Sequence, residues 1–520
     1  MTRFETGFVA LTLVLFPLAC TDDGGSSVDS GGTEVGDGDG DPGDGDGDGD
    51  PGDGDGDPGD GDGEPGDGDG DSGDGDGDSG DGDGDGDGDP DCGAPQTFET
   101  GKTPTAEIHV ATTGANDPDC GAEASPCATI QHAANLASPG TAVVIHAGTY
   151  PGGSYIANLT GTEEAPIWIG GAEGEARPVI DGGGQALHLT QARYVVIHDL
   201  EVANSTQNGI NADDGGNYAD PEAARFIVFR DLYIHDVGSG GNQDCLKLSG
   251  LDDYWVLDSE FARCGGGGSG SAVDHVGCHG GLIHGNYFHD LSQGGSAVQC
   301  KGGAADIEIR ANVFEDGGHR GVNMGGSTGF EYFRPPLADN APNVEARDIR
   351  VIANSFRGGV TPFAFVGCVD CLAANNVIVT PGNWVTRILQ ETVSTNEYEF
   401  LPASNSRFVN NIVYFDGQVG TAVNVGPNTD PDSFEFANNL WYRFDDPAQS
   451  APPGGLPVVE QDGIIGEDPL FADPDNGDYH VDPTGPAAGA GLSVIELSGD
   501  LDGLCFADPP SIGAYEAAGE

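Results

Sequence analysis

The sequence predicts an all-β fold, a solenoid of stacked strands, and three observations support this prediction. Short segments of alternating apolar and polar residues recur after residue 190, with the two-residue period of a β-strand. Six of these segments carry an asparagine two residues before their last apolar residue. The asparagines are separated by 26, 42, 22, 35 and 28 residues, a repeat of 22–28 residues with insertions. A repeat of this length cannot bury its own apolar face, so consecutive copies must stack.

The first 20 residues are predicted to be an export signal. Arg3 precedes an apolar run over residues 8–18, which is shorter than the roughly 20 residues needed to cross a membrane. The segment ends at Ala19-Cys20 and resembles a bacterial lipoprotein signal, in which the cysteine is lipidated. Lipidation at Cys20 would place the protein in the cell envelope as an outer-membrane lipoprotein, held to the membrane by its lipid anchor only. An ordinary cleaved signal peptide, which would give a secreted protein, is the alternative.

Residues 21–92 form a low-complexity tract of glycine and aspartate. The tract holds 29 acidic residues and no lysine or arginine, in a chain with a formal net charge of −69. Because it has almost no apolar side chains to bury, we expect a disordered linker that is extended by repulsion between its carboxylates. Calcium binding by the Asp-x-Asp pattern is the alternative, but the closing carboxylate and rigid turn of calcium loops do not recur. The rest of the chain is also acidic, which excludes nucleic acid as a partner.

The eleven cysteines are consistent with an exported protein. Without Cys20, ten remain, an even number in a chain directed to an oxidising compartment. Two closely spaced pairs are predicted to be disulfides: Cys120 with Cys127, and Cys368 with Cys371. The sequence leaves the pairing of the other six open.

Nine strand segments define the body of the fold. They are VVIHDL (195–200), IVFRDL (227–232), WVLDSEF (255–261), LIHGNYF (282–288), IEIRANVF (307–314), IRVIANSF (349–356), LAANNVI (372–378), RFVNNIV (407–413) and FEFANNLW (434–441). The recurring asparagines are Asn286, Asn312, Asn354, Asn376, Asn411 and Asn439. Asparagine tolerates left-handed backbone, and its amide can bond to the copy above it. We therefore expect these six to form a structural ladder and not a ligand site.

This pattern resembles the right-handed parallel β-helix family, which has the pectin lyase-like fold, over about residues 106–516. The opening segment 108–150 is typical of such proteins, and its ATIQHAANLA is expected to be a short helix that caps the first turn. The end of the chain, with IGAYE, resembles the closing segment of secreted bacterial β-helices. The resemblance implies a single-stranded β-helix over 93–455 and a closing segment over 456–520, after the signal (1–20) and the linker (21–92). The fold alone does not fix an activity.

Two of the chain's three lysines are predicted to lie in one column on the outer face. Counted from the end of the preceding strand segment, Lys247 is at position 15 and Lys301 at position 13. The same count gives positions 13 and 14 for four more residues: Asp213, Asp214, Asp274 and His275. We therefore expect carboxylates, an imidazole and two amines in one column.

Such a mixture suits β-elimination on a uronic-acid polysaccharide. Removal of the proton beside a carboxylate needs a cation that neutralises the carboxylate and a base that takes the proton. The segment 297–326 resembles most the alginate lyase and chondroitinase B branch, which implies Lys301 as the base. The further catalytic candidates are Lys247, His319 and Arg320. Calcium is the expected cofactor, with three candidate ligands: Asp213, Asp214 and Asp274.

This branch carries two glutamates before its lysine, and the chain has Gly294 and Ser296 at those positions. Its next-turn arginine would fall near Asn323, so Arg320 matches only with a shift. Asn323 and His275 are therefore candidate substrate contacts. The segment FEYFRPP (330–336) adds Tyr332 and Arg334, on a loop that would either bind a sugar and its carboxylate or cover the side of the solenoid.

The leading hypothesis is an exported, monomeric enzyme that cleaves an acidic polysaccharide by β-elimination, or epimerises it at C5 through the same proton abstraction. The alternative is a non-catalytic surface protein that binds glycans or acts as an adhesin. The missing glutamate pair favours the alternative, and the stacked lysines favour the enzyme. Two other chemistries stay open: hydrolysis by pairs among Asp213, Asp214, Asp244 and Asp274, and metal binding by His275 and His279.

Overall fold

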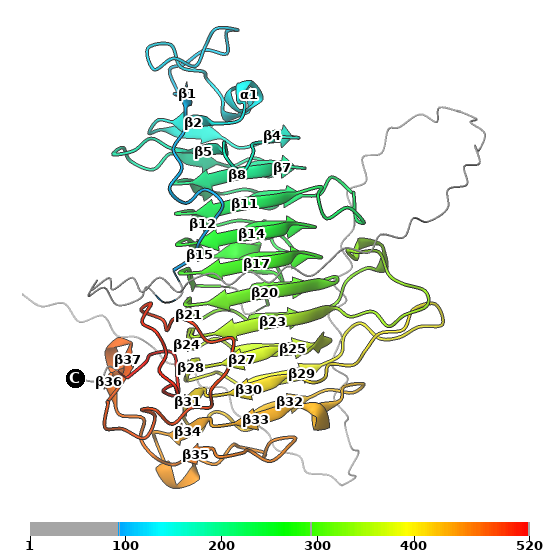
Figure 1. The fold of residues 1–520 in the computed structure, drawn as a ribbon, viewed down its shortest axis with the longest axis vertical. Coiled ribbons are helices and arrows are strands. Elements are labelled where there is room, and N and C mark those ends of the chain that lie inside the picture. Colours follow the sequence, from blue (N-terminus) through cyan, green and yellow to red (C-terminus); the bar gives the residue numbers. More distant parts are fainter. Residues whose placement is uncertain (1–91, 93, 292–293, 518–520) are drawn as a thin grey trace, which may run out of the picture. The chain divides into compact units, whose positions relative to one another are not determined.

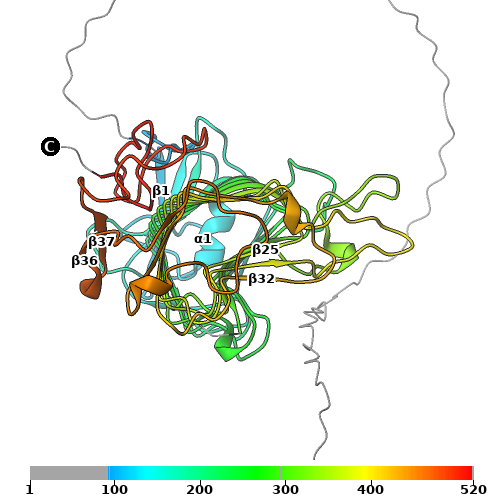
Figure 2. The same ribbon diagram turned by 90° about the horizontal axis from the view of Figure 1, so that it is seen from below.

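The computed structural model describes residues 92, 94–291 and 294–517, which form a right-handed parallel β-helix (Figure 1). The predicted signal, with Cys20, and the predicted linker up to residue 91 lie outside the described residues. Within them, three long parallel sheets of 13, 12 and 10 strands run side by side. We call these sheets 1, 2 and 3. The chain passes from sheet 1 to sheet 2 and then to sheet 3 in each turn, and Figure 2 shows the three sheets around one core.

Sheet 1 consists, in order, of β1 (Ala106–Val110), β2 (Thr141–Ile145), β5 (Ile167–Gly171), β8 (Arg193–His198), β11 (Arg225–Arg230), β14 (Asp252–Leu257), β17 (His279–His284), β20 (Ala304–Arg310), β23 (Ala346–Ile352), β27 (Leu372–Ala374), β30 (Arg407–Val409) and β33 (Glu435–Ala437), with β26 (Cys368–Val369) beside β23. Sheet 2 consists of β3 (Thr149–Pro151), β6 (Val179–Asp181), β9 (Glu201–Ala203), β12 (Tyr233–His235), β15 (Glu260–Ala262), β18 (Tyr287–His289), β21 (Val313–Glu315), β24 (Ser355–Arg357), β28 (Val377–Val379), β31 (Ile412–Phe415), β34 (Leu440–Arg443) and β35 (Ile464–Ile465).

Sheet 3, which carries the candidate site, consists of β4 (Ser154–Ala157), β7 (Leu187–Thr190), β10 (Ile210–Asp213), β13 (Leu246–Ser249), β16 (Val273–Val276), β19 (Ser296–Lys301), β22 (Arg320–Gly325), β25 (Phe363–Val366), β29 (Thr386–Leu389) and β32 (Val423–Val425). A short antiparallel pair, β36 (Phe471–Asp473) and β37 (Asp478–Val481), lies in the closing segment. The short 3-10 turns are η1 (Cys264–Gly267), η2 (Phe330–Tyr332), η3 (Pro431–Ser433), η4 (Pro447–Gln449) and η5 (Pro474–Asn476).

The predicted capping helix is present as α1 (Ile130–Leu136). The side chain of Thr129 accepts a hydrogen bond from the backbone N–H of His132 and so caps the first turn. Ile130, Ala133 and Ala134 are buried, so the helix closes the apolar end of the solenoid.

The predicted asparagine ladder is confirmed. The Oδ1 of each asparagine after Asn286 accepts hydrogen bonds of 2.9–3.1 Å from the backbone N–H and the side-chain Nδ2 of the asparagine before it. Glu460 ends the ladder by accepting the same two bonds from Asn439. All six asparagines are buried, and their amides satisfy a row of backbone groups at a corner where the chain leaves the sheet ladder.

Four disulfides link described residues, including the predicted pairs Cys120–Cys127 and Cys368–Cys371. The others are Cys245–Cys264 and Cys92–Cys505. Of the described cysteines, Cys278 and Cys300 are free and lie in the core. No helix of the described residues is long and apolar enough to span a bilayer.

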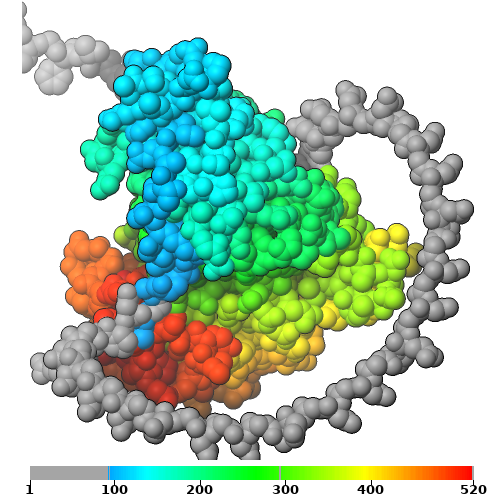
Figure 3. All heavy atoms as spheres, turned by 45° about the horizontal axis from the view of Figure 1, so that its top comes forward, coloured from blue at the N-terminus to red at the C-terminus, as the bar shows by residue number. Residues whose placement is uncertain are grey.

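The two ends of the described chain lie over the outside of the solenoid. The segment 94–105, blue in Figure 3, runs across the outer face of sheet 1, where Phe98 packs against Tyr194, Phe226 and Trp255. The closing segment packs on sheet 2 through residues such as Tyr479 and Ile512. The N-terminal segment thus covers part of sheet 1 and the closing segment covers part of sheet 2. The exposed groove lies on sheet 3.

Candidate functional site

Two columns of side chains point outward from sheet 3, because alternate residues of a strand face the same side. Column 1 contains Tyr155, His188, Asn211, Lys247, Asp274, Gln299, Asn323, Ala364, Arg387 and Asn424. Column 2 lies two residues further along each strand and contains Ala157, Thr190, Asp213, Ser249, Val276 and Lys301. Column 1 is polar or aromatic at all of these positions except Ala364.

The predicted single column is therefore wrong. Lys247 and Asp274 share column 1, whereas Lys301 and Asp213 belong to column 2. His275 lies between the columns, pairs with Cys300 in the strand register, and points into the core. The connections between strands differ in length, so a position counted from the end of the preceding strand segment does not fall at the same place in every turn. A shift of one residue reverses the face to which a side chain points.

A cavity of about 650 Å³ lies over sheet 3, and we call it the groove. Its floor comes from the two columns between Tyr155 and Lys301. The segment after β10, with Tyr218, and the loop after β22, with Tyr332, form its side wall. The volume of the groove and its mixed lining of polar and aromatic side chains are typical of a site that binds a small ligand.

Two lysines in the floor of the groove converge on one carboxylate that is buried beneath them. Lys247 Nζ donates to Asp274 Oδ2 and lies 3.4 Å from Asp244 Oδ2, and Lys301 Nζ lies 3.6 Å from Asp274 Oδ2. Burial would raise the pKa of Asp274, but the two ammonium groups outweigh burial and hold this pKa below its ordinary value. The pKa of Asp244 is raised by burial and by Asp274, against the opposing effect of Lys247. Asp274 thus stays ionised and fixes both lysines.

His188 and Asp213 form a second pair at the other end of the groove. Asp213 Oδ2 lies 2.6 Å from His188 Nε2 and accepts from Asn211 Nδ2, while its Oδ1 accepts from Thr190 Oγ1 and from the Gly215 N–H. Burial acts to raise the pKa of Asp213, but these hydrogen bonds, led by that of His188, lower it overall. The carboxylate therefore orients the imidazole, which leaves its other edge beside the ring of Tyr155.

Asp214 and Arg334 bind each other. Arg334 Nε donates to Asp214 Oδ2 at 2.6 Å and Nη2 to Oδ1 at 3.2 Å, and the guanidinium lies 4.1 Å from the ring centre of Tyr218. Both side chains are buried. Asp214 was predicted to bind a metal, and Arg334 was predicted to bind a substrate carboxylate. In the structure each of the two side chains is instead occupied by the other in one internal ion pair.

The predicted calcium ligands do not converge. Asp213 is held by His188, Asp214 by Arg334 and Asp274 by the two lysines. Across the part of the chain that the structure describes, the one group of three metal-ligating residues is Cys120, Cys127 and His132, and its cysteines form a disulfide. The donor set does not fit the several free carboxylate oxygens that calcium requires, so no chemical step is assigned to the ion.

His319, Arg320 and Asn323 lie outside the groove. Arg320 begins β22 opposite Ser296, five residues and roughly 16 Å along the strand from the position of Lys301. Its guanidinium pairs with Glu391 at 2.6 Å and with Asn323 at 3.2 Å. His319 Nε2 lies 3.2 Å from Arg387 Nη1. Lys301 and the His319-Arg320 pair, although close in sequence, do not share one ligand site.

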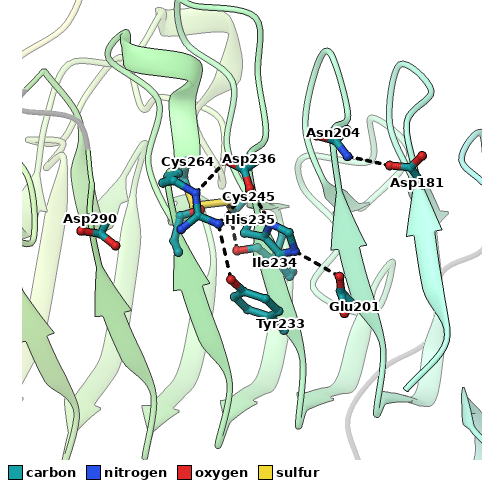
Figure 4. Close-up of polar contacts among 12 residues, drawn as sticks. Asp181, Glu201, Asn204, Tyr233, Ile234, His235, Asp236, Cys245, Cys264 and Asp290 are labelled. Atoms are coloured by element: carbon teal, nitrogen blue, oxygen red, sulfur yellow. Dashed lines mark hydrogen bonds and ion pairs between the residues drawn. A yellow bond between two sulfur atoms is a disulfide. The ribbon is translucent and has the colours of Figure 1, made fainter. Parts of the chain in front are cut away.

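A further polar cluster lies on the outer face of sheet 2 (Figure 4). His235 contacts Glu201 at 3.3 Å and Asp236 at 2.6 Å, and Arg263 Nε lies 2.7 Å from Asp236 Oδ1. The hydrogen bond from Arg263, with a smaller effect of His235, lowers the pKa of Asp236 to about 2. These charges neutralise one another along the sheet, so we assign this cluster to the scaffold.

The structure brings into the groove several residues that sequence reasoning missed, namely Tyr155, His188 and Tyr218. His188 lies in the strand LHLT, which precedes the nine segments recognised in the sequence. Alternation of apolar and polar residues in that strand was the available signal. Tyr218 lies in a connection, where no periodicity exists to place it.

No model of a known protein family matches the chain, and no curated protein sequence matches it. Solved structures are similar at low identity. Pectate lyase Pel9A is 14% identical with a TM-score of 0.48, covering 80% of this chain and 98% of that one. An alginate lyase from Paenibacillus sp. str. FPU-7 is 16% identical (TM-score 0.39; 58% and 93% covered), and the GH136 lacto-N-biosidase from Eubacterium ramulus is 16% identical (TM-score 0.46; 69% and 68% covered). These likenesses assign no activity.

Proposed function

With a right-handed parallel β-helix of pectin lyase-like fold as the premise, we propose that the protein is an exported carbohydrate-active enzyme. Its groove takes an acidic polysaccharide and cleaves it by β-elimination at a uronic-acid residue. The observation that carries the proposal is the convergence of Lys247 and Lys301, in the groove floor, on the carboxylate of Asp274 buried beneath them. In a chain with three lysines and a net charge of −69, two ammonium groups in one groove favour an anionic ligand.

The two lysines have different surroundings, which supports different roles. Lys247 lies between the carboxylates of Asp244 and Asp274, so it stays charged and neutralises the carboxylate of the sugar. Lys301 has the longer contact, 3.6 Å to Asp274, and we assign to it the removal of the proton, for which its ammonium group must first release a proton to water. The proton leaves C5 for Lys301, and its electron pair forms the C4–C5 double bond. The C4–O bond breaks, and the departing oxygen takes a proton from water.

A non-catalytic glycan-binding protein is the second candidate. Its specific support is that both lysines are already paired with carboxylates, which favours a fixed electrostatic surface over proton transfer. C5 epimerisation shares the proton abstraction and differs in returning the proton to the other face of the sugar. We also propose that the protein is exported, that it is either held in the cell envelope or secreted, and that it acts as a monomer.

The test is to incubate the full chain with alginate, pectate and chondroitin and to follow the ultraviolet absorbance of unsaturated uronate. The proposal expects a steady rise with at least one polymer. Binding of a polymer with no rise in absorbance and no exchange of the C5 hydrogen with solvent would replace the enzyme by the non-catalytic candidate. Exchange of that hydrogen without cleavage would indicate epimerisation.

A further inference from the structure

The groove ends beside Lys301. Its floor spans six strands of sheet 3, from Tyr155 on β4 to Lys301 on β19, which is five inter-strand spacings or roughly 24 Å. Among the described residues, none from a strand of sheet 3 beyond β19 lines it. The next side chains of column 1, Gln299 and Asn323, do not line the cavity. At the opposite end Tyr155 is 53% exposed, so that end is open.

The loop 326–345 closes the end at Lys301. A Cβ on Gly326 would lie 3.5 Å from the side chain of Lys301, so the loop begins in contact with that lysine. Glu345, at the far end of the loop, accepts hydrogen bonds from the Gly302 N–H, from both the N–H and the hydroxyl of Thr328, and from the hydroxyl of Thr392. These bonds tie both ends of the loop to the turn that carries Lys301.

From this attachment the loop runs back along the side of the groove. Arg334 lies over the glycines that end successive turns, where a Cβ on Gly277 would be 2.4 Å from Arg334 Cβ and one on Gly250 would be 2.7 Å from Arg334 Nε. Arg334 then reaches Asp214, three strands of sheet 3 before the strand of Lys301. Only glycine leaves room for this path at Gly250 and Gly277, so the sequences of these two turns are matched to the loop.

Aromatic contacts hold the outer side of the loop. Phe330 packs against Tyr398 at 5.4 Å and against Phe400 at 5.7 Å between ring centres, and the buried Phe333 lies 5.5 Å from Phe400. With the Asp214–Arg334 ion pair on the inner side, the loop is a fixed wall with Tyr332 facing the groove.

We propose that the groove is blind at Lys301 and open at Tyr155, so that the protein binds an end of an acidic glycan chain and not its interior. The inference takes its substrate class from the proposed function. One chain end passes Tyr155 and His188 and stops against the loop beside Lys301. Cleavage there releases short products of uniform length. Arg334 is the positioning residue, because its guanidinium is bound by Asp214 and holds the wall in place.

The first experiment does not depend on cleavage. The number of protein molecules bound per glycan chain is measured by sedimentation on size-fractionated alginate or pectate of increasing length, with Lys301→Ala protein to suppress turnover. An end-binding groove gives a constant ratio at every length. A ratio that grows in proportion to chain length would overturn the inference, whether or not the wild-type chain is an enzyme.

The second experiment examines products of the wild-type chain from the first minutes of reaction. Uniform short products with little fall in viscosity are expected, and a broad mixture of lengths from the outset would overturn the inference. If the wild type forms no unsaturated product but binds one molecule per chain, the proposed function fails and the end-binding inference stands.

Variants of the wall separate positioning from folding. Arg334→Gln combined with Asp214→Asn removes both buried charges together, so neither is left unpaired. This double variant should release longer and more varied products, whereas Arg357→Ala, at a surface arginine paired with Glu315 on sheet 2, should not. Loss of folding alone would lower the rate without changing product length. An unchanged product length in a folded double variant would refute the role of Arg334.

Discussion

At the residue scale, the groove is organised by carboxylates that are buried or half-buried and already paired. Asp274 holds two lysines, Asp213 orients His188, and Asp214 holds Arg334. A buried ion pair adds little net stability, because desolvation costs about as much as the attraction returns. Three such carboxylates beside one groove are therefore better explained by the positions they impose on their partners than by folding stability.

His275, on the inner side of the same strand, makes the fold sensitive to acid. Burial, opposed in part by its contact with the Gln299 carbonyl, lowers the pKa of His275 to about 4. The unfolded chain binds a proton near pH 6.5. Between these values the unfolded state holds more protons, so the free energy of unfolding should fall by about 3 kcal/mol as the pH drops from 6.5 to 4.

Denaturant titrations at pH 7 and pH 5 measure this effect, and the comparison is with His275→Asn. His284, with a pKa also lowered to about 4 by burial, adds a similar dependence to both proteins. The variant should therefore lose part of the wild-type pH dependence. An identical pH dependence in the two proteins would contradict the assignment to His275.

At the element scale, the asparagine ladder joins each turn to the next. Asn354 donates through Nδ2 to the Ile309 and Ile352 carbonyls and to Asn376, and accepts two bonds from Asn312. Asn354→Ala leaves several buried backbone groups without partners. Because each buried unsatisfied group costs about 1–3 kcal/mol, we expect a loss of about 3 kcal/mol in the free energy of unfolding.

Asn396→Ala, at an exposed loop position, is the matched control and should unfold as the wild type does. Equal stability of Asn354→Ala and Asn396→Ala would show that the ladder is a consequence of stacking and does not stabilise it.

Some features of these elements could be predicted from the sequence, and others could not. Period-2 alternation and the asparagine spacing predicted the strands, the stacking and the ladder, because these are local patterns repeated in every turn. The register of sheet 3 was not predicted, since connections of varying length moved Lys301 into column 2 and turned His275 inward. The partner of Arg334 is 120 residues away, and no local pattern encodes such a contact.

At the scale of the whole molecule, the charge of the protein opposes the ligand proposed for it. A chain of net charge −69 repels an acidic glycan at long range, whereas the lysines act only within the groove. Screening shortens from about 30 Å at 0.01 M salt to about 8 Å at 0.15 M. The association rate with an acidic oligosaccharide should therefore rise severalfold over this range of salt.

Stopped-flow measurements of binding at increasing salt test this expectation, with a neutral oligosaccharide of equal length as the reference. An association rate that falls as salt increases would mean that attraction by the lysines of the groove outweighs repulsion by the net negative charge of the chain, and would contradict this expectation.

The central claim is that Lys301 takes the proton from the sugar. The direct measurement is the rate of unsaturated product formation by Lys301→Ala beside Lys102→Ala, which removes the only lysine outside the groove. We expect a loss of about 100-fold or more for Lys301→Ala, as for removal of a general base, and a near wild-type rate for Lys102→Ala. Wild-type activity in a folded Lys301→Ala protein would contradict it.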